Sequence, residues 1–520
     1  MKVNIVFGGP AGTGPNIVTN LLGKALVGQG YYVFYSRDYQ SLIRGGHNFN
    51  TLTFSDEPVF SNDSGIDILV AFDKKTIEIH KGSLRSSAYT SGHKNLSRGP
   101  KLQSKGAKEA IIIEPAEKGN MYYAGKLFKL LCLDFKILDQ ELKDLGNRYE
   151  ENVKDAKEGY EIETKKVCEL RSGKSSNGFM NGSQGIAEGA LKSEMDIYYA
   201  YPMTPATPVL MELGQATLDE KNNLKVVELE NEIAVANAGV GSCMVGKKVM
   251  VGTSGGGFDL MTETLSLCGI AEIPLVFYLS MRPGPGTGVA TYSAQGDLNI
   301  ARHAGHGEFQ RVVLAPGDPK ESEELTNQAF YFSHKFKVPS IVVSDKHLGE
   351  SFYTIEGNAK LEKINVSTKL KRFNSYEVDA EGSATEDPKI IEENIVRRMK
   401  KVWEIEAEAK KFEMYSVYGK KNSENVVVFW GSPKGAVLDA IKDLDCTAVQ
   451  IKYIEPFPKE VLKLLKDKNV ILVENNSTGL LADLIREKTG LLIEDKNKIL
   501  KFNGRAFLGD ELKTELEKRI

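Results

Sequence analysis

Acidic residues that interrupt an apolar segment are the first candidates for chemistry in this sequence. Glu228, Glu230 and Glu232 surround the point where a predicted strand, residues 226–229, leads into a predicted helix, residues 233–245. The helix is rich in alanine and glycine, which allow another element to pack closely against it. A carboxylate beside an apolar helix at such a junction is a candidate for a functional buried acid, although most acidic side chains are solvated.

A stiff polar loop follows the preceding predicted strand, residues 196–200. It contains Tyr201, Pro202 and Thr204, and two further prolines complete the segment 201–208. Proline fixes the backbone φ angle, so the loop holds its threonine hydroxyls in place. We interpret it as a ligand-binding loop; the alternative is a rigid connector without a ligand.

Two further loops follow buried strands of the same region. Ser254 and Gly255 begin a glycine-rich segment that gives a ligand room to approach the backbone closely. Arg282 leaves the predicted strand 274–280 into a loop of prolines and glycines that also contains Thr287. A guanidinium in this position is suited to bind a carboxylate through two parallel hydrogen bonds, to which Thr287 adds a hydroxyl. The alternative is an arginine paired with a structural acid.

The N-terminal segment carries a weaker signal for anion binding. A predicted strand, residues 3–7, ends in a turn with Gly12 and Gly14, and an amphipathic helix follows. Backbone N–H groups and the helix dipole favour an anion at such a turn, but the spacing fits neither a P-loop nor G-x-G-x-x-G. Arg44, Gly45 and Gly46 offer a second phosphate or subunit contact. Close packing of strand and helix explains the glycines of the turn equally well.

Charge, cysteine spacing and hydropathy exclude several classes of protein. The 520 residues carry a net charge of −3, which does not favour nucleic-acid binding. The five cysteines lie singly without a C-x-x-C pair, so the chain lacks the ligand spacing of a zinc or iron–sulfur site, and they favour a reducing compartment. His303 and His306 lack a third ligand, so we predict no metal. Apolar runs such as residues 273–279 are too short to cross a membrane, which takes roughly 20 residues. We therefore expect a cytoplasmic protein.

Runs rich in Val and Ile alternate with helical patterns along the chain, which is typical of α/β folds with parallel sheets. We predict three consecutive parallel-sheet units. A Gly/Ser/Asn-rich stretch near residues 171–185 and a charged helical segment within residues 371–424 separate them. The domains are then residues 1–170, 186–370 and 425–520.

Four motifs in order identify a family. The segment Tyr201–Pro208 resembles the Y-P-I-T-P-x-T/S-P signature of 2-oxoacid:ferredoxin oxidoreductase α subunits, with Met203 in place of Ile. Residues 230–234 resemble E-D-E-I-A, residues 253–262 resemble T-S-G-P-G-F-S-L-M-T, and residues 282–288 resemble R-G/P-G-P-S-T-G. Residues 253–262 depart from the family motif at Gly256 and Asp259, and residues 282–288 depart from it at Gly286.

The resemblance extends to both ends of the chain. Residues 1–170 resemble the family's γ domain, the catalytic domain III of pyruvate:ferredoxin oxidoreductase, in the fused γ–α arrangement. Residues 186–370 resemble a thiamine diphosphate pyrimidine-binding domain, and residues 425–520 resemble a transketolase C-terminal-like domain. Residues near 87–108 look like an insertion, for which the sequence gives no role.

The resemblance implies an oxidoreductase of two subunit types that converts a 2-oxoacid and coenzyme A to acyl-CoA, CO₂ and reduced ferredoxin. This chain is then expected to share thiamine diphosphate with a β subunit that holds Mg²⁺ and a [4Fe–4S] cluster, in a heterodimer or heterotetramer. Pyruvate, 2-oxoglutarate and other 2-oxoacids are all compatible with the motifs. The alternatives are a non-redox thiamine-dependent decarboxylase subunit and a non-catalytic regulatory or scaffold subunit.

The resemblance also implies roles for individual residues. Glu232 corresponds to the glutamate that binds the aminopyrimidine ring of the cofactor and starts catalysis. Arg282, Thr287 and Thr204 are expected to bind the substrate. The residues expected to line the cofactor are Tyr201, Pro202, Thr204, Glu232, Ser254 and Gly255. The residues expected to contact coenzyme A or another subunit are Gly12, Gly14, Arg44, Gly45 and Gly46.

Overall fold

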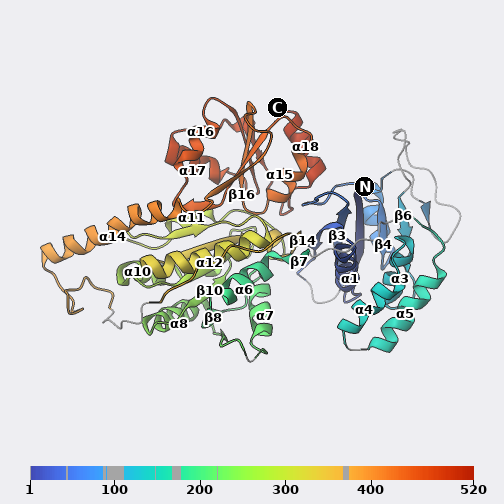
Figure 1. Ribbon diagram of the computed structural model, residues 1–520, viewed down its shortest axis with the longest axis horizontal. Coiled ribbons are helices and arrows are strands. Elements are labelled where there is room, and N and C mark those ends of the chain that lie inside the picture. The colour runs from blue at the N-terminus through green and yellow to red at the C-terminus, as the bar shows by residue number, and fades with distance from the viewer. Residues whose placement is uncertain are drawn as a thin grey trace. The chain divides into compact units, whose positions relative to one another are not determined.

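Buried strands rich in Val and Ile form three sheets in two compact units of the chain (Figure 1). The computed structural model describes residues 2–41, 45–85, 89–90, 110–146, 148–166, 177–219, 221–366 and 374–520. Unit 1 comprises residues 1–180, 351–357 and 508–511, and unit 2 comprises residues 181–350, 358–507 and 512–520. Arg44, most of the insertion near residues 87–108 and the first half of the expected linker lie outside the described residues.

Unit 1 contains an eight-stranded sheet in the order β5-β6-β4-β1-β3-β2-β14-β7. Strands β5, β6, β4 and β1 are parallel, whereas β1, β3, β2 and β14 pair antiparallel. The strands are β1 (Lys2–Ala11), β2 (Tyr32–Asp38), β3 (Gly45–Ser55), β4 (Ile68–Ala71), β5 (Tyr89–Thr90), β6 (Ile111–Ile113), β7 (Gly178–Asn181) and β14 (Phe352–Ile355). The helices are α1 (Pro15–Gly28), α2 (Lys74–His80), α3 (Asn120–Leu130), α4 (Phe135–Asp144) and α5 (Tyr149–Ile162), with a 3₁₀ turn at Lys81–Ser83.

Unit 2 begins with a seven-stranded sheet in the order β18-β12-β13-β11-β10-β8-β9, parallel except for β18. Its strands are β8 (Ile197–Ala200), β9 (Lys225–Glu228), β10 (Val249–Thr253), β11 (Val276–Met281), β12 (Val312–Leu314), β13 (Ser340–Asp345) and β18 (Tyr453–Glu455). The associated helices are α6 (Gly182–Lys192), α7 (Thr207–Ala216), α8 (Glu232–Met244), α9 (Gly255–Leu260), α10 (Thr262–Ala271), α11 (Leu298–His303), α12 (Pro319–Phe336), α13 (Lys346–Glu350) and α14 (Pro388–Ala409).

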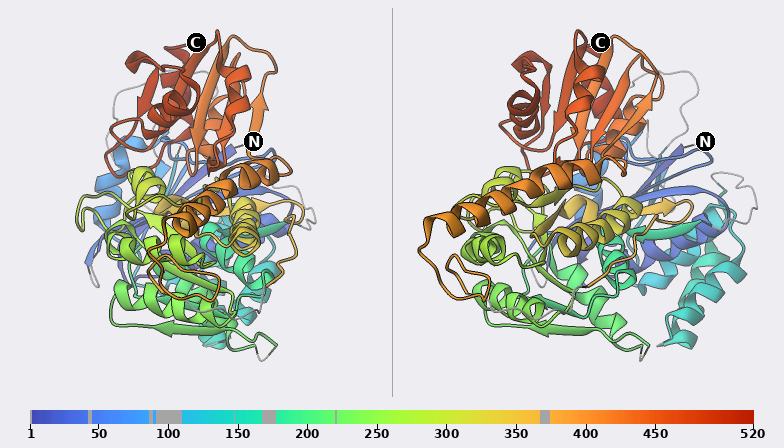
Figure 2. Two further views of the ribbon diagram at one scale, coloured as in Figure 1. Left: turned by 90° about the vertical axis from the view of Figure 1, so that its left-hand side faces the viewer. Right: turned by 60° about the vertical axis from the view of Figure 1, so that its left-hand side comes forward.

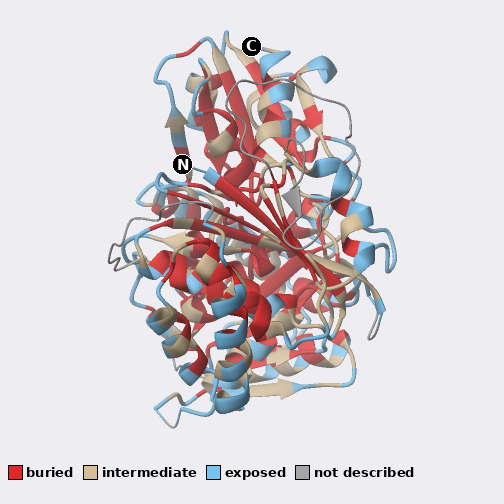
Figure 3. Cartoon of the chain, turned by 90° about the vertical axis from the view of Figure 1, so that its right-hand side faces the viewer, coloured by how far each residue is buried: buried red, intermediate tan, exposed pale blue. Residues whose placement is uncertain are grey.

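Side chains that alternate along the strands of this sheet belong to two different hydrophobic cores, one on each face of the sheet. Val251 and Phe277 pack with α8 and α10, whereas Met250 and Tyr278 pack with α6, α7 and α12. The helices therefore cover both faces, as the period-two pattern of a buried parallel sheet requires. The long helix α14, orange in Figure 2, packs alongside α12. Buried residues, red in Figure 3, concentrate in the strands and on the inner faces of the helices.

The last part of unit 2 is a five-stranded sheet in the order β15-β17-β16-β19-β20, parallel except for β15. Its strands are β15 (Tyr415–Gly419), β16 (Asn425–Trp430), β17 (Thr447–Ile451), β19 (Asn469–Glu474) and β20 (Lys498–Leu500). Its helices are α15 (Lys434–Ala440), α16 (Leu462–Leu465), α17 (Leu480–Thr489) and α18 (Gly509–Glu517), with 3₁₀ turns at Lys459–Val461 and Asp495–Asn497.

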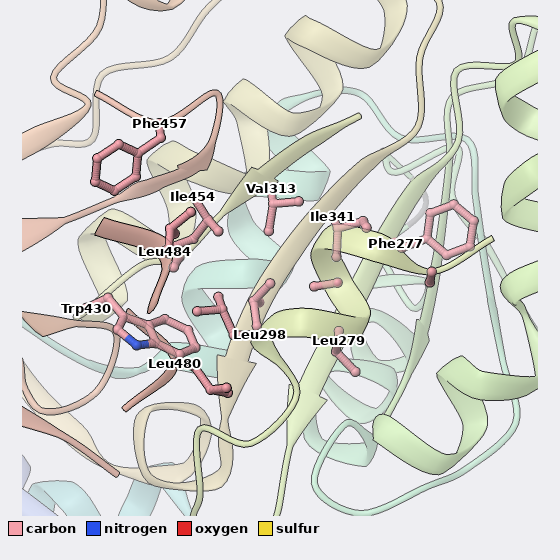
Figure 4. Close-up of a cluster of buried hydrophobic side chains, with 14 of the residues drawn as sticks. Phe277, Leu279, Leu298, Val313, Ile341, Trp430, Ile454, Phe457, Leu480 and Leu484 are labelled. Carbon is pink, nitrogen blue, oxygen red and sulfur yellow. The ribbon is translucent and has the colours of Figure 1, made fainter. Parts of the chain in front are cut away.

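One hydrophobic core runs through both sheets of unit 2. Trp430 and Leu484 of the C-terminal part belong to the same buried cluster as Leu279 and Ile341 of the seven-stranded sheet and Leu298 of α11 (Figure 4). Strand β18 adds to this continuity, because it is a C-terminal segment that pairs with β12. The C-terminal part is therefore packed as a support for the seven-stranded sheet.

The predicted α/β fold with successive, mostly parallel sheets is confirmed. Three details differ from the sequence prediction. Strand β3 was not predicted, and it makes the middle of the first sheet antiparallel. Residues 178–181 form β7 and α6 starts at Gly182, where the linker 171–185 was expected. Strand β15 occupies part of the expected linker 371–424. The exact domain bounds stay a prediction. Among the described residues, no helix has the length and apolarity needed to span a membrane.

Candidate functional site

Four loops of unit 2 start at one edge of the seven-stranded sheet. The strands β9, β8, β10 and β11 are parallel neighbours, with Ala200 opposite both Glu228 and Gly252 and with Thr253 opposite Leu279. Their carboxyl ends therefore lie side by side, and the segments that follow them are the ones that the sequence singled out. Ligands of open α/β sheets bind at this edge.

Glu232 lies at the start of α8, in the loop that follows β9. The side chain of Asn231 caps the helix by accepting a hydrogen bond of 2.9 Å from the N–H of Ala234, which fixes Glu232 as the first helical residue. Glu232 is only 3% exposed, and its Oε1 atom has no hydrogen-bond partner among the described residues. Burial of an unpartnered carboxylate oxygen is costly, so this atom is poised for a donor from outside the chain.

The glycine-rich loop after β10 approaches Glu232 very closely. A methyl group built on Gly257 would lie 2.5 Å from Oε1 of Glu232 and 2.1 Å from Oγ1 of Thr253, so only glycine fits here. The hydroxyl of Ser254 is also buried without a partner in the described chain. Oγ1 of Thr253 donates to Sδ of Met203 at 3.9 Å, which connects this loop to the proline loop. The structure therefore brings together the loops that carry Glu232, Ser254 and the prolines, while the roles of these residues stay a prediction.

The proline loop is also joined to the arginine. Nη1 of Arg282 donates to the backbone oxygen of Thr204 at 2.7 Å. The chain then turns back tightly: the N–H of Val289 donates to the oxygen of Pro283 at 3.0 Å, and Gly288 has φ +54° with no space for a side chain. Arg282 is half-buried, and this burial lowers its pKa. One guanidinium donor is thus used to hold the loop, and the other donors have no acceptor among the described residues.

The other predicted residues of unit 2 lie at the open side of these loops. Tyr201, Pro202 and Thr287 are exposed. Thr287 makes no hydrogen bond with the described part of the chain, so its hydroxyl is not fixed toward Arg282. Gly255 is the first residue of α9.

Asp297 is a site residue that the sequence analysis missed. It precedes α11 but its side chain does not cap the helix. A methyl group built on Gly255 would lie 2.6 Å from Oδ2 of Asp297, which places this carboxyl group against the glycine-rich loop. Burial and the charge of Asp259 raise the pKa of Asp297 to about 6, although Arg282 opposes the shift. The signal in the sequence, an aspartate before a helix, is too common to identify such a residue.

Gln295, which the sequence analysis also missed, anchors the end of the arginine loop. It is fully buried and makes four hydrogen bonds to the C-terminal sheet. Its N–H donates to the oxygen of Asn475 at 2.8 Å, and its Oε1 accepts from the N–H of Asn475 at 2.8 Å. Its Nε2 donates to the oxygen of Trp430 at 2.9 Å, and its backbone oxygen accepts from Nδ2 of Asn476 at 3.0 Å. The C-terminal sheet therefore holds the segment that lies between Arg282 and Asp297.

The glycine turn of unit 1 follows β1 and lies beside the start of β3. Ala11, at the end of β1, lies opposite Gly45, so the turn at Gly12 and Gly14 is next to the start of β3. All of the described glycines predicted here, Gly12, Gly14, Gly45 and Gly46, have positive φ angles. A methyl group built on Gly14 would lie 2.2 Å from Nδ2 of Asn120, at the start of α3. Two helices, α1 and α3, therefore begin at this turn.

Two family models match the chain. Residues 188–419 match the thiamine diphosphate-binding model of pyruvate flavodoxin/ferredoxin oxidoreductases. Residues 4–162 match the model described as pyruvate ferredoxin/flavodoxin oxidoreductase. The first match contains the four loops at the sheet edge, and the second contains the glycine turn.

Curated relatives match over the whole chain or large parts of it. A 2-oxoacid:ferredoxin oxidoreductase subunit alpha from Sulfolobus sp. is 30% identical, over 100% of this chain and 97% of the relative. A 2-oxoglutarate synthase subunit from Methanocaldococcus jannaschii is 29% identical, over 57% of this chain and 88% of the relative. The 2-oxoglutarate:ferredoxin oxidoreductase from Magnetococcus marinus, solved with 2-oxoglutarate, coenzyme A and succinyl-CoA bound, has the same fold. Its TM-score is 0.86 with 23% identity, over 100% of this chain and 99% of that chain.

Three observations indicate the same family: the motifs, the convergence of their loops, and the match to a relative over nearly its full length. The chain belongs to the family of 2-oxoacid:ferredoxin oxidoreductase α subunits.

Proposed function

We propose that this chain supplies half of the active site of a thiamine-diphosphate-dependent 2-oxoacid:ferredoxin oxidoreductase. The reaction converts a 2-oxoacid, coenzyme A and two oxidised ferredoxins to acyl-CoA, CO₂, two reduced ferredoxins and a proton. The observation that carries this proposal is the buried, unpartnered Oε1 of Glu232 at the edge where the four loops meet. When bound, thiamine diphosphate supplies a carbon nucleophile for the 2-oxo carbon and holds the electrons that remain after CO₂ leaves.

Glu232 fits the recognition of an aminopyrimidine ring. Its Oε1 is a strong acceptor without a donor among the described residues, and the glycine at position 257 keeps the space beside it free of a side chain. In this proposal Oε1 accepts a hydrogen bond from a protonated ring nitrogen and so stabilises that protonation state of the ring. The residues proposed to line the same cofactor are Ser254, Gly255, Thr204, Tyr201 and Pro202.

Arg282 is proposed to bind the carboxylate of the 2-oxoacid. The hydrogen bond to the backbone oxygen of Thr204 fixes the guanidinium group and leaves further N–H donors for an anion. Thr204 is the residue of the proline loop that Arg282 contacts, and Thr287 belongs to the loop that continues from Arg282.

A partner β subunit is proposed to complete the site. Single, scattered cysteines offer no cluster spacing in this chain, so we place the [4Fe–4S] cluster in the partner. The family resemblance is the reason for placing Mg²⁺ there as well. The exposed stripe of α8 supports a partner at this position. Ile233 is 50% exposed and Val245 is 65% exposed, and Asn237 and Gly241 lie between them at helical spacing. The stripe begins directly beside Glu232, so a subunit that covers it reaches the site.

Coenzyme A is the proposed acyl acceptor. The Magnetococcus marinus enzyme was solved with coenzyme A and succinyl-CoA, which supports the same cosubstrate for this chain. The glycine turn of unit 1 is the proposed contact for coenzyme A or for another subunit, through Gly12, Gly14, Gly45 and Gly46 together with Arg44. Ferredoxin is the proposed electron acceptor. The four cysteines in the described part of the chain are free, which favours a reducing compartment such as the cytoplasm.

The proposal is tested with the chain co-expressed with its partner subunit. The complex is expected to reduce a viologen dye only when both a 2-oxoacid and coenzyme A are present. Glu232→Ala is expected to lower the rate at least about a hundredfold, because an acid–base group contributes on that order. Glu230→Ala is the matched control, because this neighbouring acid is exposed, and it is expected to keep the rate of the unaltered complex. Full activity of Glu232→Ala would show that the assigned role is wrong.

A further inference from the structure

We infer that Arg505 is a positioning residue for Arg282. Its guanidinium group packs over the ring of Tyr292 and thereby holds the arginine loop, residues 282–295, in the conformation in which Arg282 receives the substrate carboxylate. The C-terminal part of the chain then contributes to substrate affinity without contacting the substrate. This inference rests on the proposed function, because it takes Arg282 as the residue that binds the 2-oxoacid.

The arginine loop is closed by contacts between its own residues. The N–H of Val289 donates to the oxygen of Pro283 at 3.0 Å, and the N–H of Tyr292 donates to the oxygen of Val289 at 3.2 Å. A methyl group built on Gly288 would lie 1.7 Å from the oxygen of Pro283, so the two halves of the loop are in direct contact. A displacement of Tyr292 therefore displaces Pro283, and with it Arg282.

Gly504, in the segment 501–505 after β20, contacts both ends of this loop. Its carbonyl oxygen accepts a hydrogen bond of 3.1 Å from the N–H of Ser293. A methyl group built on Gly504, which has φ +79°, would lie 3.3 Å from Cβ of Tyr292 and 3.8 Å from Cγ of Pro283. The backbone of this segment therefore packs against the residue that follows Arg282 as well as against Tyr292.

The side chain of Arg505 extends this contact over the aromatic ring. Its Cζ atom lies 3.7 Å from the centroid of the Tyr292 ring, well within the roughly 6 Å of a cation–π interaction. A planar guanidinium group can lie flat on an aromatic ring, whereas an ammonium group cannot. Tyr292 is half-buried and Arg505 is exposed, so the arginine lies on the solvent side of the contact.

The segment that carries Arg505 is itself fixed to the C-terminal sheet. Nδ2 of Asn475 donates to the oxygen of Lys501 at 2.5 Å and to the oxygen of Arg505 at 3.2 Å. The N–H of Lys501 donates to the oxygen of Glu474 at 3.2 Å. Asn475 also binds Gln295, so one residue fixes both this segment and the end of the arginine loop. Arg505 therefore packs over Tyr292 from a fixed support.

The kinetic test uses the complex with the partner subunit, with pyruvate and 2-oxoglutarate assayed separately by viologen reduction. Arg505→Ala and Tyr292→Leu are each expected to raise KM for the accepted 2-oxoacid about two- to fivefold, as loss of an exposed cation–π contact predicts. kcat and KM for coenzyme A are expected to stay unchanged. Arg486→Ala is the matched control, because it removes the same charge from an exposed position of α17, and it is expected to keep all three constants.

Two further variants distinguish the contact from attraction of the substrate by the charge of Arg505. Arg505→Lys keeps the charge but loses the planar group, so KM is expected to stay raised. Arg505→Ala combined with Tyr292→Leu is expected to raise KM no further than either change alone, because each one already breaks the contact. An unchanged KM in Arg505→Ala, a normal KM in Arg505→Lys, or effects that multiply in the combined variant would overturn the inference.

Hydrogen–deuterium exchange of the isolated chain gives a readout without turnover. Peptides that cover residues 283–293 are expected to exchange faster in Arg505→Ala than in the unaltered chain, whereas peptides of β10 and β11 keep their rates. Equal exchange of residues 283–293 in both chains would overturn the inference. Failure of the proposed function is distinct from this result: the complex would then turn over neither 2-oxoacid, although Arg505→Ala still exchanges faster.

Discussion

Glu232 combines deep burial with an unsatisfied carboxylate oxygen, a combination that is rare for a purely structural side chain. The carboxyl group is almost fully buried, yet one of its oxygens has no donor in the described chain. A folded protein retains such a group at a cost to stability, and the usual reason is a ligand that completes the hydrogen bonds. The isolated chain should therefore be more stable when this charge is removed.

Glu232→Gln tests that expectation. Glutamine has nearly the same shape but carries no charge, so the cost of burying an unpartnered carboxylate disappears. We expect the thermal unfolding midpoint of the isolated chain to stay the same or to rise by a few degrees, while the complex loses activity about a hundredfold or more. A lower midpoint would indicate that the carboxylate has a structural partner.

Arg282 is expected to act through the shape of its guanidinium group as well as its charge. In Arg282→Lys the positive charge stays, but the paired N–H donors and the hydrogen bond to Thr204 are lost. We expect KM for the 2-oxoacid to increase about tenfold or more, since a charge-assisted hydrogen bond contributes roughly 1.5 to 3 kcal/mol. KM for coenzyme A is the internal control and should not change. An equal increase in both constants would contradict a specific role in carboxylate binding.

At the scale of elements, the site depends on how closely α9 approaches α8. The loop after β10 brings Gly257 against Glu232 and Thr253. Gly256, one residue earlier, is exposed, and no atom lies within 4 Å of the place where its Cβ atom would be. Adjacent glycines with different surroundings allow a matched comparison.

Gly257→Ala is expected to displace Glu232, because the added methyl group would lie within 2.5 Å of its carboxylate. Thiamine diphosphate should then activate the complex only at concentrations about tenfold or more above those that the unaltered complex needs. Gly256→Ala is expected to leave this concentration unchanged. The measurement is the rate of viologen reduction as a function of added cofactor. Equal behaviour of the two variants would show that the close approach is not required.

The sequence predicts the arrangement of the parallel strands better than it predicts the contacts that support the site. Tyr201, Ser254 and Arg282 follow buried strands, and parallel strands end at a common edge, so their convergence was predictable. The structural setting of Gln295 was not predictable, since its partners Trp430 and Asn475 are more than 130 residues away in the chain. Strand β3 was missed because it begins with two glycines and alternates asparagine and threonine with apolar residues.

At the scale of the whole molecule, unit 2 depends on buried charge as well as on its shared core. Lys434 donates to Glu321 at 2.7 Å and also binds Asp318, which joins the C-terminal sheet to the start of α12. Glu474, at the end of β19, accepts from Nε1 of Trp430 at 2.7 Å and from the N–H of Leu481 at 3.1 Å. Complete burial raises the pKa of Glu474 to about 7.

The shift at Glu474 predicts a pH dependence of stability. An unfolded glutamate has a pKa of about 4.3, so between that pH and about 7 the folded state binds a proton that the unfolded state has released. Stability from this group is therefore present at low pH and is lost as pH rises through that range, by about 4 kcal/mol in total. Glu474→Gln removes this titration. We expect its thermal midpoint to match that of the unaltered chain near pH 5 and to exceed it near pH 8. Parallel pH profiles would contradict the shift.

Strand β14 has a consequence for the order in which the chain folds during synthesis. It comes from the middle of the sequence, yet it pairs with β2 in the sheet of unit 1, where Phe352 stacks on Tyr35 and the hydroxyl of Thr354 accepts from the N–H of Val33. Residues 1–180 therefore leave the ribosome with one edge of their sheet unpaired, and it stays unpaired until residues 352–355 have been made. Release of a shortened chain before that point would expose an edge strand that invites pairing with other chains, so translation of the first 355 residues is the period in which a chaperone has most to protect.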